Sequence, residues 1–306
     1  MRFLWFLESI RTPFLDTAFS VITRLGEEMV LIVVFCLVFW CINKKTGYVI
    51  GIVFFLSALI VQGMKPIFRI DRPWITDPAF SPVDGVVGAA TGYSFPSGHT
   101  QAASAYLVPL GVMFKHKALK IIFFMLVLLV AFSRLYLGVH YLSDVLASLV
   151  IAVIITIPAV KFIALAPEGK RRDIITSLVI LFFAVSVILL ATSLYRSGVT
   201  SAEQVRDSVL AAGAGTGFAV GMYIERTYIK FSVKAQNIPL QIVKLIIGLA
   251  GTIGIQEGAR VIGDGLVADW IRYFLMILWL IALYPLIIKR FFTDVEFRKK
   301  DQSWNH

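Results

Sequence analysis

Long runs of apolar residues restrict what this chain can fold into more than any other feature. Predominantly apolar stretches of 18 or more residues recur along its 306 residues, and one such stretch can cross the hydrocarbon core of a bilayer as a helix. The apolar residues are continuous rather than alternating, which predicts helices and not the strands of a barrel. Only 16% of the residues are charged, against about 25% in soluble domains. We therefore predict an all-α, polytopic transmembrane helical bundle.

The apolar runs predict nine membrane spans. We place them at residues 27–43, 47–68, 99–115, 119–137, 141–163, 174–195, 208–225, 240–262 and 268–289. The N-terminal segment 1–26 carries Glu8, Asp16 and Pro13 within its apolar part, which argues against a cleavable signal peptide. We interpret it either as an amphipathic segment at the membrane surface or as an ordinary helix packed on the bundle.

Basic residues gather in every second connection, and this indicates the orientation of the bundle. They are Lys44 and Lys45; Lys115, Lys117 and Lys120; Lys170, Arg171 and Arg172; Arg226, Lys230 and Lys234; and Lys289, Arg290, Arg298, Lys299 and Lys300. By the positive-inside rule these connections are cytoplasmic. The net charge of +10 is then a topology signal with contacts to anionic membrane lipids, and we expect no nucleic-acid partner. Segment 69–98 would lie outside.

The two cysteines, Cys36 and Cys41, both lie inside one apolar run. Their placement favours buried small side chains over a disulfide framework or a metal site.

Three short stretches carry unusual polar residues, and the predicted topology places all three at the outer face. The first is "KPIFRIDRP", with Lys65 and Arg72. The second is "PSGH", with Ser97, Gly98 and His99. The third is "SRLYLGVHYLSD", with Arg134, His140 and Asp144. Taken singly, a snorkelling lysine, a helix cap and a structural histidine explain them. Taken together, charged residues in a bilayer indicate a functional site.

These three motifs, in this order, resemble the signature motifs of the type 2 phosphatidic acid phosphatase (PAP2) superfamily, which includes membrane lipid phosphatases. The resemblance covers residues 65–144 and implies a six-helix core over about 27–165. The apolar runs in 166–306 predict additional C-terminal transmembrane helices beyond this core. The stretch "LGEEMVLIVVFCLVFWCINKKTGYVIG" further resembles the sphingosine-phosphate-phosphatase-like branch. The family is metal-independent, so the resemblance implies neither metal nor cofactor.

The chemistry of these residues suits phosphoryl transfer, which depends on positioning and on stabilising charge on the phosphoryl oxygens. Lys65, Arg72 and Arg134 supply fixed cations, and the guanidinium forks suit two phosphate oxygens each. The Ser97 hydroxyl and the Gly98 N–H add donors at a helix N-terminus, and Gly98 lets a phosphate approach the backbone.

We interpret His140 as the nucleophile that forms a covalent intermediate. Asp144, four residues on, would share a helix face with it and fix its tautomer. His99 would protonate the leaving oxygen and then activate water. The matching positions have these roles in the family.

Small residues at four-residue spacing mark two later helices. They are Gly213, Gly217 and Gly221, and then Ala250, Gly254 and Gly258. This spacing permits close helix approach, either within the chain or in a homodimer.

The sequence therefore predicts a membrane phosphatase with its active site on the extracytoplasmic side of the cell membrane. Its lipid substrate would carry a phosphate or pyrophosphate. Undecaprenyl pyrophosphate is our first expectation, and phosphatidylglycerophosphate or phosphatidic acid the second. A lipid phosphotransferase and a non-enzymatic transporter or scaffold are the alternatives. The complete motif set argues against the last.

Overall fold

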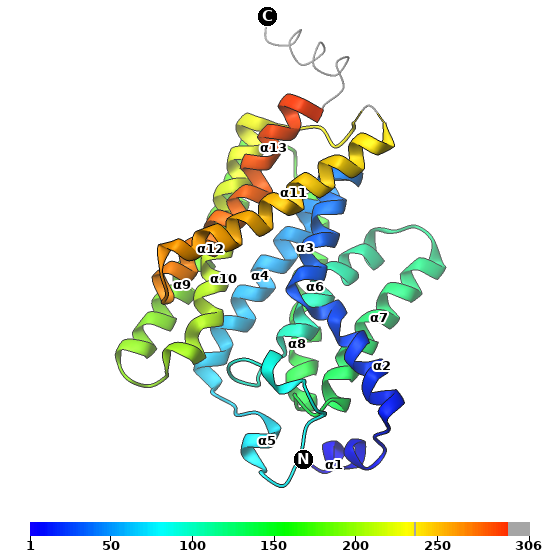
Figure 1. The fold of residues 1–306 in the computed structure, drawn as a ribbon. Helices are drawn as coiled ribbons and strands as arrows, with labels where there is room; N and C mark the ends of the chain where they lie inside the picture. Colours follow the sequence, from blue (N-terminus) through cyan, green and yellow to red (C-terminus); the bar gives the residue numbers. More distant parts are fainter. Residues whose placement is uncertain (236, 293–306) are drawn as a thin grey trace, which may run out of the picture.

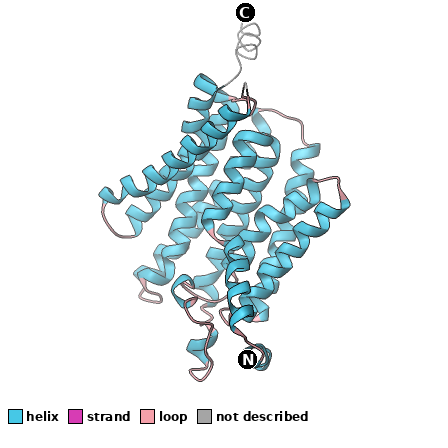
Figure 2. Ribbon diagram, turned by 45° about the vertical axis from the view of Figure 1, so that its right-hand side comes forward, coloured by secondary structure: helices cyan, strands magenta, loops and turns pink. Residues whose placement is uncertain are grey.

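One central helix, α4, runs from Lys44 to Phe68 and packs against α6, α8, α9 and α10. A computed structural model of the chain describes residues 1–235 and 237–292 (Figure 1). The predicted basic residues Arg298, Lys299 and Lys300 lie outside the described residues. Within them the chain contains helices and no strand, as Figure 2 shows, which confirms the predicted fold class.

The remaining α-helices follow in chain order. They are α1 (Arg2–Ser9), α2 (Pro13–Thr23), α3 (Glu28–Cys36), α5 (Pro73–Thr76), α6 (Gly98–Met113), α7 (Lys117–Tyr136), α8 (Leu142–Leu165), α9 (Lys170–Arg196), α10 (Ala202–Ile224), α11 (Ile238–Gly258), α12 (Leu266–Leu278) and α13 (Tyr284–Ile287). Short 3₁₀ segments are η1 (Arg24–Gly26), η3 (Val87–Ala89) and η5 (Ala259–Ile262). Short π-helical segments are η2 (Leu37–Ile42), η4 (Glu225–Ile229), η6 (Trp279–Leu283) and η7 (Ile288–Phe292).

Six of the described helices are long and apolar enough to span a membrane, and α2 with α3 forms a seventh if this pair, bent by 51°, is one span. The chain is thus a multi-span membrane protein. Two of the nine predicted spans, 99–115 and 208–225, are not among the described helices that meet this criterion of length and apolar composition. These segments form α6 and α10.

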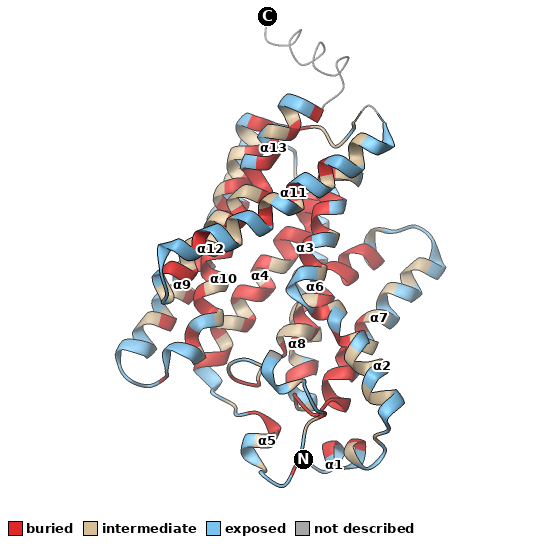
Figure 3. Cartoon of the chain, viewed as in Figure 1, coloured by how far each residue is buried: buried red, intermediate tan, exposed pale blue. Residues whose placement is uncertain are grey.

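The reason for this difference is the position of α6 and α10 inside the bundle. In α6, 11 of 16 residues are buried, whereas in α9 only 7 of 27 are. Figure 3 shows the same contrast between inner and outer helices. A helix enclosed by protein does not need the uniformly apolar surface that lipid demands, so small and polar residues are retained there.

The N-terminal segment divides into two helices with different surroundings. Phe19 of α2 packs against Tyr136 of α7 with ring centroids 4.5 Å apart, and the Tyr136 hydroxyl donates to Asp16 at 2.8 Å. Residues 13–23 are therefore a helix packed on the bundle, one of our two interpretations. In α1, Phe3 and Phe6 are exposed while Leu4 and Leu7 are buried, an amphipathic arrangement.

The predicted core (27–165) and the predicted extension (166–306) share one hydrophobic interior within the described residues. Phe55 of α4 stacks on Phe218 of α10 with centroids 4.6 Å apart, and Ser208 donates to the Gln62 carbonyl at 2.6 Å. A Cβ added at Gly51 would lie 2.4 Å from the Phe218 ring. The close approach of α4 and α10 therefore needs glycine at this position. This helix packing joins the extension to the core.

The first small-residue stripe is used inside the chain. A Cβ at Gly213 would lie 2.4 Å from the Trp270 carbonyl, and one at Gly217 would lie 2.6 Å from the Phe274 carbonyl, both on α12. Added Cβ atoms at Gly254 and Gly258 would meet no described atom within 4 Å. A homodimer through the second stripe remains a prediction.

Candidate active site

One cavity of about 280 Å³ collects residues from all three motifs. We call it the motif cavity. Its polar wall contains Lys65, Arg72, Gly98, His99, Arg134 and His140. These residues come from four separate segments: the end of α4, the loop before α5, the start of α6, and the end of α7 with the connection that follows it. Helix packing thus brings together side chains that lie up to 75 positions apart in the sequence.

Lys65 stands in the last turn of α4 and is only 4% exposed. Its Nζ lies 3.8 Å from Oδ2 of Asp207, which belongs to α10. The Thr91 hydroxyl donates to the same Asp207 oxygen at 2.9 Å. The extension therefore contributes a carboxylate to the edge of the cationic cluster.

Arg72 precedes α5 and is 4% exposed. Its Nη2 donates to the Thr91 carbonyl at 2.6 Å, its Nε to the Gly92 carbonyl at 3.2 Å, and its Nη1 to the Val139 carbonyl at 2.9 Å. These carbonyls neutralise no charge, so they hold the guanidinium in place and leave its positive charge available to an anion.

Arg134 lies in the last turn of α7 and is 2% exposed. Its Nη1 donates to the Thr23 hydroxyl at 2.7 Å. Its Nε is buried and has no hydrogen-bond partner among the described residues. A buried, unsatisfied donor of a charged group is costly, and at a cavity wall it marks a position for an acceptor.

The "PSGH" stretch forms the start of α6, with Ser97 as its N-cap. The Ser97 Oγ accepts from the Thr100 hydroxyl at 3.0 Å, and Ser97 does not line the motif cavity. Its observed contacts are those of a helix cap. Gly98 and His99 do line the cavity. A Cβ added at Gly98 would meet no described atom within 4 Å, which leaves room beside the backbone N–H.

His140 and Asp144 meet as the spacing suggested, but not on one helix. His140 lies in the connection before α8, and Asp144 lies in the first turn of α8. His140 Nδ1 is 3.2 Å from Asp144 Oδ2, and that oxygen also accepts from the Tyr141 N–H at 2.9 Å. The carboxylate caps the N-terminus of α8, so the helix begins after His140 instead of including it.

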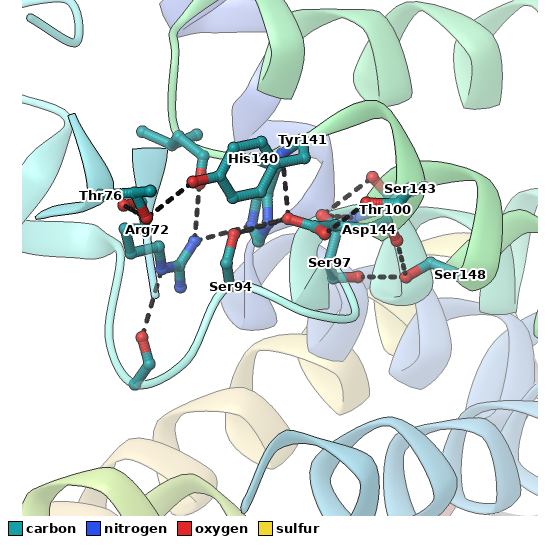
Figure 4. Close-up of polar contacts among 12 residues, drawn as sticks. Arg72, Thr76, Ser94, Ser97, Thr100, His140, Tyr141, Ser143, Asp144 and Ser148 are labelled. Atoms are coloured by element: carbon teal, nitrogen blue, oxygen red, sulfur yellow. Dashed lines mark hydrogen bonds and ion pairs between the residues drawn. The ribbon is translucent and has the colours of Figure 1, made fainter. Parts of the chain in front are cut away.

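Ser94 completes this arrangement, as Figure 4 shows. Its hydroxyl donates to Asp144 Oδ2 at 2.5 Å and lies 3.4 Å from His140 Nδ1. On the other edge of the ring, Arg72 Nη1 lies 2.9 Å from His140 Nε2. Because a guanidinium nitrogen can only donate, Nε2 must carry the lone pair and Nδ1 the proton.

The environment keeps His140 neutral. Burial, followed by the charges of Arg72 and Arg134, lowers the pKa of His140 well below its ordinary value of 6.5. A neutral imidazole with its lone pair at the cavity wall is in the protonation state that nucleophilic attack requires.

The second part of the motif cavity is apolar and is lined jointly by the core and the extension. The core side chains are Leu31, Ile32, Phe35, Ile50, Phe54 and Phe55, and the extension side chains are Leu210, Ala211, Ala214, Ile277, Leu280 and Ile281. Tyr273 of α12 donates to Glu28 of α3 at 3.0 Å, so the two parts of the chain are also joined beside the cavity.

Sequence analysis missed two residues of this site. Ser94 lies three positions before Ser97, and its small polar side chain gave no separate signal. Asp207 lies on α10, far outside the motifs, and an acidic residue near a helix start is ordinary in sequence. Within the described residues, no three His, Cys, Asp or Glu side chains are grouped so that they could hold a metal ion.

Residues 46–168 match the PAP2 superfamily, and residues 209–296 match the PAP2 superfamily phosphatase transmembrane extension. The chain is 31% identical over 150 residues to phosphatidylglycerophosphatase B of Bacillus subtilis, covering 45% of this chain and 70% of that protein. It is 28% identical over 158 residues to lipid A 4'-phosphatase of Porphyromonas gingivalis, covering 49% of this chain and 66% of that protein.

A third relative is a probable sphingosine-1-phosphate phosphatase of Dictyostelium discoideum. It is 30% identical over 165 residues, covering 48% of this chain and 38% of that protein. No solved structure matches the chain significantly.

Proposed function

Because the chain belongs to the PAP2 superfamily, we propose that it is an integral-membrane phosphatase that hydrolyses a lipid phosphate or pyrophosphate. One observation carries this proposal: the motif cavity joins a cationic wall to an apolar chamber. A lipid phosphate has the same two parts, a charged head group and a hydrocarbon chain. The named relatives act on phosphorylated lipids according to their names, which supports the same substrate class here.

In the first step, the Nε2 lone pair of His140 attacks phosphorus, and the bond from phosphorus to the leaving oxygen breaks. Burial, followed by the charges of Arg134, Arg72 and Lys65, lowers the pKa of His99 to about 3 in the free protein. His99 therefore takes up a proton from the substrate phosphate when it binds, and then gives this proton to the leaving oxygen. The product is a phosphohistidine and a dephosphorylated lipid. Asp144 accepts a hydrogen bond from the Nδ1–H of His140. This contact orients the imidazole ring and stabilises the positive charge that develops on it.

In the second step, His99 accepts a proton from water, and the water oxygen attacks the phosphohistidine. Inorganic phosphate leaves and His140 returns to its neutral state. Lys65, Arg72 and Arg134 stabilise the phosphoryl oxygens in both steps. The reaction then needs no metal ion, because the three cations supply the positive charge.

Substrate binding has to open one observed contact. Arg72 Nη1 lies 2.9 Å from His140 Nε2, so it faces the atom that must attack phosphorus. A phosphate oxygen would take over this Arg72 donor, and phosphorus would then face Nε2. Arg134 Nε, which has no partner among the described residues, would donate to a second oxygen.

We place this chemistry on the extracytoplasmic side of the cell membrane. Lys44, Lys45, Lys170 and Lys230 gather around a second pocket near the opposite end of α4 from Lys65, and by the positive-inside rule that basic end is cytoplasmic. Undecaprenyl pyrophosphate is our first candidate because it is a lipid pyrophosphate exposed at that face. Phosphatidylglycerophosphate and phosphatidic acid are the second candidates.

The test is phosphate release from a panel of these lipids by detergent-purified protein, with His140→Ala as the inactive control. Chelators should leave release unchanged, and vanadate should inhibit it. No release from any lipid by folded protein would contradict the proposed hydrolysis. Release only after a lipid or sugar acceptor is added would indicate a phosphotransferase instead.

The chamber is tested with p-nitrophenyl phosphate, which has no chain. Ala211→Phe fills the apolar part of the motif cavity, so we expect it to reduce turnover of lipid substrates strongly and that of p-nitrophenyl phosphate little. Ala202→Phe, on an exposed residue of the same helix, is the matched control. Equal loss on both substrates in Ala211→Phe would show that the chamber does not hold the lipid chain.

A further inference from the structure

A second cavity lies at the other end of the bundle. It has a volume of about 620 Å³ and lies between α4, α8, α9 and η4. We call it the basic pocket. Lys44 begins α4 and lines this pocket, while Lys65 lines the motif cavity. At 1.5 Å per residue the two positions are roughly 30 Å apart along the helix, so the pockets belong to opposite membrane faces.

The basic pocket carries more positive than negative charge. Its cationic residues are Lys44, Lys45, Lys170, Arg172, Arg226 and Lys230, and its acidic residues are Glu168 and Asp173. The fully buried Glu225 accepts from Lys44 and from the Tyr48 hydroxyl. Asp173 accepts from Arg226 Nε at 2.6 Å. Lys45 and Lys170 form no ion pair within the described residues, so the excess charge lies on them and on Lys230.

Two buried polar atoms in this pocket lack hydrogen-bond partners among the described residues: Arg172 Nε and Thr227 Oγ1. Arg172 is only 6% exposed, and its Nη1 donates to the Ala166 carbonyl at 3.1 Å. Arg172 forms two long ion pairs, from Nε to Asp173 at 3.7 Å and from Nη2 to Glu168 at 3.9 Å, and both distances are beyond a hydrogen bond. A buried guanidinium donor and a hydroxyl left open at a cavity wall fit an oxygen-rich anion.

The walls of the pocket are not uniformly polar. Ile52 of α4, Ile163 of α8 and Met222 of α10 line it together with the cations. An inorganic anion would leave these apolar side chains uncovered, whereas an amphiphile would cover both parts. Basic pockets between membrane helices on the cytoplasmic side are suited to anionic lipid head groups.

From these contacts we propose that the basic pocket binds the phosphate head group of an anionic phospholipid from the cytoplasmic leaflet. The site is separate from the motif cavity and does not depend on the proposed phosphatase activity. Its position between helices of the core and of the extension means that the lipid would join the two parts at this face, as Phe55 and Phe218 do inside the bundle.

The test is the thermal unfolding of the detergent-purified full-length protein, followed by tryptophan fluorescence. Dioleoyl phosphatidylglycerol is titrated against dioleoyl phosphatidylcholine, inorganic phosphate and glycerol phosphate. Phosphatidylglycerol is a phosphodiester and not a substrate of a phosphomonoesterase. A ligand that binds only the folded state raises the unfolding temperature with its concentration, so the titration gives an apparent affinity.

We expect phosphatidylglycerol alone to stabilise the wild type. Lys45→Gln/Lys170→Gln, which changes two exposed residues, should weaken the apparent affinity by about tenfold or more. The matched control is Lys115→Gln/Lys117→Gln, which removes the same charge from the same face outside the pocket. Arg134→Gln, in the motif cavity, should leave the lipid effect unchanged.

Three results would overturn the proposal. Equal weakening in Lys115→Gln/Lys117→Gln would mean general attraction to a basic surface. Loss of the effect in Arg134→Gln would place the lipid in the motif cavity. Equal stabilisation by inorganic phosphate would show an anion site without lipid recognition.

Discussion

The two ends of the bundle both collect cationic side chains, but they neutralise them differently. In the basic pocket Lys44 pairs with Glu225, and Arg226 pairs with Asp173. In the motif cavity Arg72 and Arg134 contact backbone carbonyls and a hydroxyl, and neither forms an ion pair within the described residues. Lys65 has only the 3.8 Å contact with Asp207.

Burying a cation costs free energy unless an anion compensates it. At the basic end, carboxylates of the protein itself compensate the buried cations. The exposed Lys45, Lys170 and Lys230 remain available to a lipid head group. At the motif end, no carboxylate among the described residues forms an ion pair with Arg72 or Arg134. Their charges indicate that a substrate supplies the compensating anion.

The largest effect should come from the nucleophile. His140→Ala removes the atom that attacks phosphorus, so phosphate release should fall by about 10⁴-fold or more. The measurement is phosphate release from the best lipid of the panel, with gel filtration as a check on folding. A folded His140→Ala protein with wild-type turnover would remove the basis of the mechanism.

Replacing one unpaired cation should have the next largest effect. Arg134→Gln keeps a polar side chain but removes a charge that stabilises the transition state, and kcat should fall by about 10²- to 10³-fold. Lys45→Gln, at the other end of the bundle, is the matched control and should change kcat by less than about twofold. Similar losses in both variants would mean that the two clusters do not differ in function.

Asp207 offers a smaller test of the same idea. Its carboxylate faces Lys65 and would repel a phosphate, so Asp207→Asn should lower KM severalfold while kcat changes less. Glu203→Gln changes the same charge at an exposed position of α10 and should leave KM unchanged. A higher KM in Asp207→Asn would show instead that the carboxylate holds Lys65 in its working position.

The smallest expected effect is on stability. The folded protein holds the pKa of His140 below the ordinary 6.5, so below pH 6.5 the unfolded chain binds a proton that the folded chain does not. Stability should then fall as pH decreases, by about 1.4 kcal/mol per unit for this one group.

Thermal unfolding at pH 7 and pH 5.5 measures this loss. It should be smaller in His140→Gln than in the wild type. In His116→Gln, which changes an exposed histidine between α6 and α7, the loss should equal that of the wild type. An unchanged loss in His140→Gln would contradict the assigned protonation.

The motifs predicted much of the site because each one lies at a helix end, where the chain direction is restricted. Gly98 and His99 start α6, and Lys65 and Arg134 end α4 and α7, so all four face one cavity. The helical placement of His140 was wrong because Asp144 caps α8 with its side chain. Spacing alone does not reveal which carboxylate acts as a cap.

The contribution of the extension was not predictable from sequence. Asp207 and Ala211 reach the motif cavity only because glycine at 51 lets α10 approach α4. Likewise α6 and α10 were assigned as spans from their apolar content, and their enclosure by other helices is a property of packing. Long-range helix contacts of this kind leave no periodic signal in one sequence.

The most direct measurement is the identity of the covalent intermediate. The protein is mixed with substrate, denatured in alkali within the first turnovers, and its phosphopeptides are sequenced by mass spectrometry. Our account predicts an acid-labile phosphate on His140, absent from His140→Ala and more abundant in His99→Asn, because the second step is slowed. Rapid turnover with phosphate on another residue, or on none in both wild type and His99→Asn, would contradict it.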